Sequence, residues 1–89
     1  MDTKRMDKDT VRQEIRNFIV ETFLFGADAS MLEDSDSFMQ NGVVDSTGIL
    51  EVTGFIEEKY SIQIENEEMT PANLDSVDNL VNFIARKSN

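Results

Sequence analysis

The chain has 89 residues, of which 39% are hydrophobic and 29% are charged, a balance that favours a small folded domain over a disordered chain. Its 18 acidic and 8 basic residues give a formal net charge of -10, which repels nucleic acid and anionic membrane surfaces and favours partners rich in Lys and Arg. Cysteine is absent, so disulfides and thiolate chemistry are excluded.

The length leaves room for a single domain over residues 1–89, in which we expect residues 1–8 to be a flexible N-terminal segment. No uncharged run approaches the roughly 18 residues that a membrane span needs. The charged start MDTKRMDKD is not followed by the apolar core of a signal peptide, so we expect a cytoplasmic location.

The first predicted helix runs from Thr10 to Leu24, where apolar residues recur at helical spacing. Thr10 and Gln13 match a capping box at its start, and Gly26 suits a left-handed stop just beyond its end. The stripe that we expect to be buried consists of Val11, Ile15, Phe18, Ile19 and Phe23.

Residues 27–44 are too irregular for a helix but too apolar for a free linker. We expect a long loop pinned to the core, with a turn at Asn41-Gly42 just before the next helix. The apolar residues expected to pin it are Met31, Leu32, Phe38, Val43 and Val44.

The second predicted helix runs from Ser46 to Tyr60, with Asp45 placed to cap its positive end. Gly48 and Gly54 each weaken a helix by up to about 1 kcal/mol relative to alanine. Local propensity gives no reason for these glycines, and close approach by a partner is one explanation. The expected apolar stripe is Ile49, Val52, Ile56 and Tyr60.

After an extended connector at residues 61–64, Thr70-Pro71 predicts a very short helix that reaches Leu74. Asp75 or Ser76 can cap a last helix from Val77 to Lys87, with Arg86 and Lys87 favourably placed at its negative end. Its expected inward residues are Val77, Leu80, Val81, Phe83 and Ile84. The prediction is an all-α fold, a small bundle of three longer helices and one short helix.

Ser46 follows Asp45 at the point where the loop ends, and the chain offers it no catalytic base. Serine hydrolysis needs a base, usually histidine, but histidine is absent and Lys59 lies most of a helix away. We therefore expect no catalytic residues and no enzyme activity. Without further context, Ser46 is interpreted as a second helix-capping residue.

The segment GVVDSTGILEVTGFIEEKYSIQI resembles the acyl carrier protein family, whose hallmark is a G-x-[DE]-S-[LM] motif at the start of the second of four helices. The resemblance covers nearly the whole chain, through the closing SVDNLVNFIARK. It implies an acyl-carrier-type four-helix bundle in which Ser46 is esterified to 4'-phosphopantetheine from coenzyme A, beside Asp45 as helix cap. The arm would carry acyl, aminoacyl or polyketide groups as thioesters, in fatty acid, polyketide or nonribosomal peptide biosynthesis.

The implied partners are a phosphopantetheinyl transferase, a loading ligase for acyl or aminoacyl groups, and downstream synthase or transferase enzymes, with the carrier as a monomer. The sequence departs from the family pattern at Thr47, where most relatives have Leu or Met, and this departure affects the choice of partner. DSTG and TPANLDSV look more like stand-alone carriers for specialised ligases than like the housekeeping fatty-acid carrier. The positions that resemble the family's acidic docking face are Thr47, Leu50, Glu51, Gly54, Glu57 and Glu58.

Two other classes of protein compete with a carrier. Asp34, Asp36 and Asp45 fall at positions 1, 3 and 12 of a calcium-loop window, but Phe38 and Met39 occupy positions where an oxygen ligand and a glycine belong, so we expect no metal site. The second alternative is a small acidic helical adaptor in which Ser46 is only a cap.

The resemblance also implies that the gap between the second and third helices can admit a short acyl chain. Phe55 is bulky and could fill or gate that gap, and the sequence leaves this question open.

Overall fold

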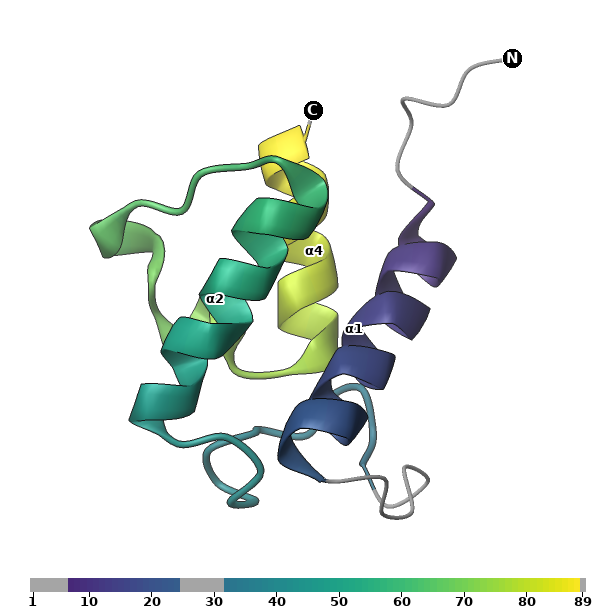
Figure 1. Ribbon diagram of the computed structural model, residues 1–89, viewed down its shortest axis with the longest axis vertical. Helices are drawn as coiled ribbons and strands as arrows, with labels where there is room; N and C mark the ends of the chain where they lie inside the picture. Colours follow the sequence, from purple (N-terminus) through teal and green to yellow (C-terminus); the bar gives the residue numbers. More distant parts are fainter. Residues whose placement is uncertain (1–6, 25–31, 89) are drawn as a thin grey trace.

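The computed structural model describes residues 7–24 and 32–88, which form a small all-α domain (Figure 1). Within these residues there are four α-helices, one 3-10 turn and no strand, so the predicted fold class of three longer helices and one short helix is confirmed. The elements are α1 (Lys8–Phe23), α2 (Ser46–Tyr60), η2 (Asn66–Glu68), α3 (Pro71–Leu74) and α4 (Val77–Ser88).

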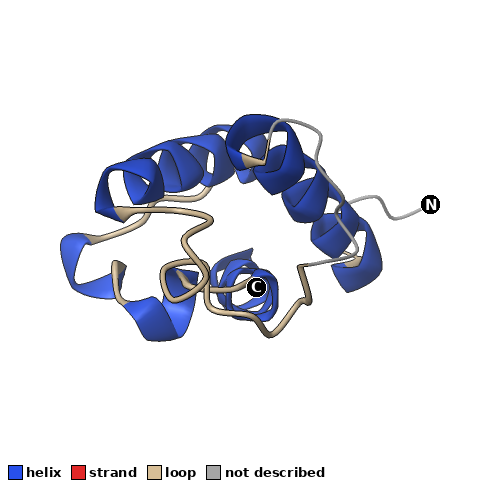
Figure 2. Ribbon diagram, turned by 90° about the horizontal axis from the view of Figure 1, so that it is seen from below, coloured by secondary structure: helices blue, strands red, loops and turns tan. Residues whose placement is uncertain are grey.

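Helix α4 is the centre of the packing, and α1, α2 and α3 each pack against it. Figure 2 shows α4 nearly end-on among the other helices. The five predicted inward residues of α4 are all buried, and burial of this apolar surface is the main stabilising term of so small a fold. The buried core consists of Val11, Ile15, Ile19, Leu32, Phe38, Val44, Val52, Ile56, Leu74, Val77, Leu80, Val81, Phe83 and Ile84.

The start of α1 differs from the prediction. The helix begins at Lys8, and Asp7 caps it by accepting a hydrogen bond from the Asp9 N–H at 3.2 Å. The predicted Thr10–Gln13 capping box is therefore wrong, and the Thr10 hydroxyl instead donates to Asp7 at 3.1 Å. Lys8 also belongs to the helix and not to the expected N-terminal segment, whereas the predicted stop at Gly26 lies outside the described residues.

The loop before α2 is pinned to the core as predicted. Leu32, Phe38 and Val44 are buried, and Gly42 turns the chain with φ +71°. Asp34 anchors the loop to α1, because its carboxylate accepts from Arg16 Nη1 at 2.7 Å and pairs with Arg12 Nε at 3.0 Å. The contribution expected from Met31 lies outside the described residues.

The connector predicted to be extended over residues 61–64 begins instead with Ser61 in the left-handed conformation, and residues 62–65 then form neither helix nor strand. The sequence did not indicate the following turn, η2, which is closed by a reciprocal capping box between Glu65 and Glu68. The hydrogen bond from the Glu65 N–H, and then the bond from Lys87 at 2.9 Å, lower the pKa of Glu68. These bonds tie the connector to the end of α4.

Ser76, and not Asp75, caps α4, since its hydroxyl oxygen accepts from the Asn79 N–H at 3.0 Å. Thr70 and Pro71 begin α3 as predicted, and Arg86 and Lys87 lie in the last turn of α4. None of the helices in the described ranges combines the length and the apolar run that crossing a bilayer requires.

Candidate functional site

Ser46 is the first residue of α2, and it is exposed. Asp45 precedes it in an extended conformation, and its Oδ1 accepts from the Gly48 N–H at 2.7 Å, which confirms the predicted cap. No hydrogen bond among the described residues engages the Ser46 hydroxyl. The site therefore consists of a free hydroxyl on a rigidly started helix, next to the partial positive charge of the helix N-terminus.

The first turn of α2 packs against the end of α1. Gly48 is buried, and a β-carbon added to it would lie 2.8 Å from Cε1 of Phe23 and 3.0 Å from Cγ1 of Val44. Gly48 therefore accommodates a close approach within the chain, and no partner is needed to explain it. Gly54 differs, because nothing lies within 4 Å of the corresponding point.

A largely apolar cleft of about 260 Å³ opens directly beside Ser46. It lies between α2, the preceding loop and the α3 region. Its lining residues are Met39, Ser46, Ile49, Met69, Thr70, Pro71 and Leu74. The sequence predicted an apolar stripe that includes Ile49 and a short helix that reaches Leu74, but it gave no signal for Met39 or Met69, because the cleft forms only where distant segments meet.

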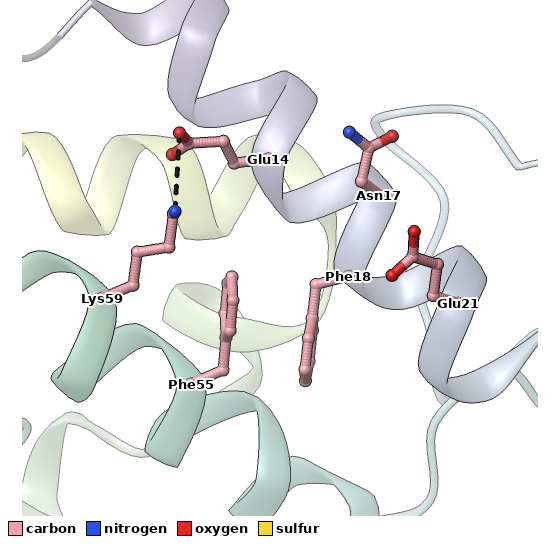
Figure 3. Close-up of a pocket in the computed structure, with 6 residues that line it drawn as sticks. All are labelled: Glu14, Asn17, Phe18, Glu21, Phe55 and Lys59. Carbon is pink, nitrogen blue, oxygen red and sulfur yellow. Dashed lines mark ion pairs between the residues drawn. The ribbon is translucent and has the colours of Figure 1, made fainter.

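Phe55 does not fill this cleft. Its ring stacks on Phe18 of α1, with centroids 4.1 Å apart and an interplanar angle of 10°, which answers the question that the sequence left open: the ring faces α1 and not the gap between α2 and α3 (Figure 3). Helix α2 turns this ring toward α1 because Phe55 lies beside the stripe that packs on α4. A separate groove of about 250 Å³ runs along this aromatic contact, lined by Glu14, Asn17, Phe18, Glu21, Phe55 and Lys59.

Lys59 lies at the far end of α2, about 20 Å from Ser46 along the helix axis, and its side chain already has a partner. It pairs with Glu14 at 3.7 Å, and the Tyr60 hydroxyl donates to the same carboxylate at 2.6 Å. Burial, the hydrogen bond to Glu14 and the charge of Glu14 together raise the pKa of Tyr60. Neither side chain can act as a base at Ser46.

The predicted docking residues of α2 fall into two groups. Most of them are exposed, and Leu50, at 61% exposure, is one of the two exposed large apolar side chains in the described ranges; the other is Met39, at 44%. Glu57 is half-buried, and its Oε2 accepts from the Ile64 N–H at 2.9 Å, so it also holds the connector. The exposed members are Thr47, Leu50, Glu51, Gly54 and Glu58.

The carboxylates of the calcium-loop window serve other contacts. Asp34 binds two arginines, Asp36 accepts from the Glu33 N–H at 2.9 Å, and Asp45 caps α2. Over residues 7–24 and 32–88, no group of three potential metal ligands comes together.

Comparison with known proteins does not assign this chain to a family. No protein-family model matches this chain, and no curated protein matches it. The fold and the site thus define a small all-α domain that presents a free serine hydroxyl beside an apolar cleft.

Proposed function

We propose that this chain is an acyl-carrier-type protein that bears 4'-phosphopantetheine on Ser46. The observation that carries the proposal is that Ser46, an exposed residue with a free hydroxyl, is itself one of the residues that line an apolar cleft. A tether attached there can extend into solvent toward an enzyme or bend back along the apolar lining. A plain helix cap requires neither the exposure nor the cleft.

The surroundings of Ser46 suit attachment by a separate enzyme. An attachment serine needs to be accessible and rigidly held, and the Asp45 cap with the Phe23–Gly48 contact provides the rigidity. It needs no base of its own when a transferase supplies one. The phosphodiester would also lie at the start of α2, where backbone N–H groups favour negative charge.

The exposed face of α2 next to Ser46 is the proposed docking surface for the transferase, the loading ligase and later enzymes. Leu50 can make an apolar contact with a partner enzyme, and Glu51 and Glu58 can pair with its basic residues. Gly54 has no side chain and so leaves room for the partner to approach the helix. Exposed charge pairs contribute typically under about 1 kcal/mol each, so association would be fast and weak, as a shuttle requires. Thr47 narrows the set of partners, in keeping with a stand-alone carrier for a specialised ligase.

The test is modification of the intact chain. It is incubated with coenzyme A and a broad-specificity phosphopantetheinyl transferase, and the protein is then weighed and the modified residue mapped. We expect the mass of one phosphopantetheine group on Ser46, none on Ser46→Ala, and normal modification of Ser35→Ala, which removes an exposed loop serine. An unchanged mass would reject the carrier function and favour the adaptor interpretation.

A further inference from the structure

Asp75 joins the loop before α2 to the junction between α3 and α4. Its Oδ1 accepts a hydrogen bond from the Met39 N–H at 3.0 Å, and its Oδ2 accepts one from the Ser37 hydroxyl. Its carbonyl oxygen accepts a third bond, from the Phe38 N–H at 3.0 Å. One residue thus holds three consecutive residues of the loop.

The held segment is compact in itself. The Ser37 hydroxyl oxygen accepts from the Gln40 N–H at 3.1 Å, and the Ser37 carbonyl accepts from Asn41 Nδ2 at 2.7 Å. The Phe38 side chain is fully buried. The segment is therefore fixed both by the buried Phe38 ring and by its bonds to Asp75.

Met39 is the member of this segment whose side chain lines the cleft. Met39 is 44% exposed, so part of its side chain remains open to solvent. A methionine side chain adapts easily to neighbouring shapes, but here its backbone is fixed by Asp75. The position of this wall is thus set by a contact outside the cleft.

We propose that Asp75 is a positioning residue that fixes Met39 at the edge of the cleft, and that Met39 held there shields an aliphatic acyl group on the Ser46 arm from solvent. The inference rests on the proposed carrier function and deepens it. When the two side-chain contacts of Asp75 are removed, the Met39 N–H loses its acceptor and Met39 can move outward, while the main-chain bond to Phe38 still holds the loop. A chain lying in the cleft is then less protected from solvent, whereas a chain too short to reach the wall is unaffected.

The experiment measures how well the cleft shields a bound thioester. The intact chain is loaded at Ser46 from acetyl- or hexanoyl-coenzyme A by the transferase, and cleavage of each thioester by hydroxylamine is timed. We expect the hexanoyl thioester to be cleaved more slowly than the acetyl thioester in the unmodified sequence. Asp75→Ala removes two side-chain hydrogen bonds but keeps the main-chain bond to Phe38, so it should accelerate hexanoyl cleavage at least roughly fivefold and leave acetyl cleavage unchanged.

Two further variants separate positioning from general destabilisation. Ser37→Ala removes the bond to Asp75 Oδ2 and the acceptor of the Gln40 N–H, but it keeps the bond from the Met39 N–H to Asp75, so it should give a smaller acceleration in the same direction. Asp78→Ala is the matched control, because it removes a carboxylate of the same region that binds Arg12 at 3.2 Å and keeps the bond from the Asp78 N–H to the Asp34 carbonyl, and it should leave both rates unchanged. With methionine methyl groups labelled, the Met39 and Met69 resonances should shift between acetyl and hexanoyl forms.

Three results would overturn the inference. Equal cleavage of both thioesters in the unmodified sequence would show that the cleft holds no chain. An unchanged hexanoyl-to-acetyl ratio in folded Asp75→Ala would show that Asp75 is structural only. Failure to modify Ser46 is detected earlier, by mass, and would reject the carrier function together with this inference.

Discussion

Phe23 and Gly48 are packed so closely that a β-carbon on Gly48 would lie 2.8 Å from the Phe23 ring. This contact joins the end of α1 to the first turn of α2, directly beneath Ser46. The glycine is thus part of the way in which the fold presents the serine, and its effect can be measured.

Gly48→Ala should destabilise the protein, whereas Gly54→Ala should stabilise it. At Gly48 the added methyl group meets Phe23 and Val44, and overpacking of this kind costs about 1–3 kcal/mol. At Gly54 the methyl group meets nothing, so alanine gains roughly 0.5–1 kcal/mol from helix propensity. Urea unfolding of both variants measures the difference, and equal effects would contradict the packing at Gly48.

Asp45→Ala should lower the free energy of unfolding by about 0.5–2 kcal/mol, because the Gly48 N–H loses its acceptor. The looser first turn should also slow modification of Ser46 by the transferase. Asp45→Asn keeps an acceptor oxygen and should retain most of the stability. Unfolding curves and modification rates for both variants test the cap, and wild-type behaviour of Asp45→Ala would argue against its role.

Glu57 and Glu58 should behave differently although they are adjacent. Glu57→Ala leaves the Ile64 N–H without its acceptor and should cost about 1 kcal/mol of stability. Glu58→Ala should leave stability unchanged and weaken binding to the transferase at low ionic strength, because Glu58 is exposed. Calorimetric binding at low and high salt tests this prediction, and an affinity that does not depend on salt would refute the electrostatic account.

Tyr60 should make stability sensitive to alkaline pH. Burial and the contact with Glu14 raise its pKa above the usual value, which is about 10. The folded state then keeps a proton that the unfolded state has lost, so this contribution is complete below about pH 10 and falls as the pH rises further. The urea midpoint of Tyr60→Phe should fall less than that of the unmodified sequence between about pH 9 and about pH 11. An equal loss in both proteins would contradict the prediction.

Much of the framework of α2 could be read from the sequence because its signals are local. Asp45 bonds to an N–H only three residues away, and this contact sets the start of the helix at Ser46. The burial of Val52 and Ile56 follows from helical spacing. At α1, by contrast, the sequence predicted a start at Thr10 and the structure starts the helix after Asp7, because the residues between them are polar and the apolar pattern gives no signal there.

The sequence by itself determined the all-α class, the course of α2 and the position of Ser46 at a capped helix start. Only the tertiary structure decided that Phe55 faces α1 and that residue 48 has no room for a side chain. It also decided that Asp75 binds the loop before α2 and that a cleft opens beside Ser46. Each of these depends on residues far apart in the chain, such as Phe18 with Phe55 or Met39 with Asp75. A periodic pattern shows that a side chain points inward, but the neighbour it meets is set by how the helices pack.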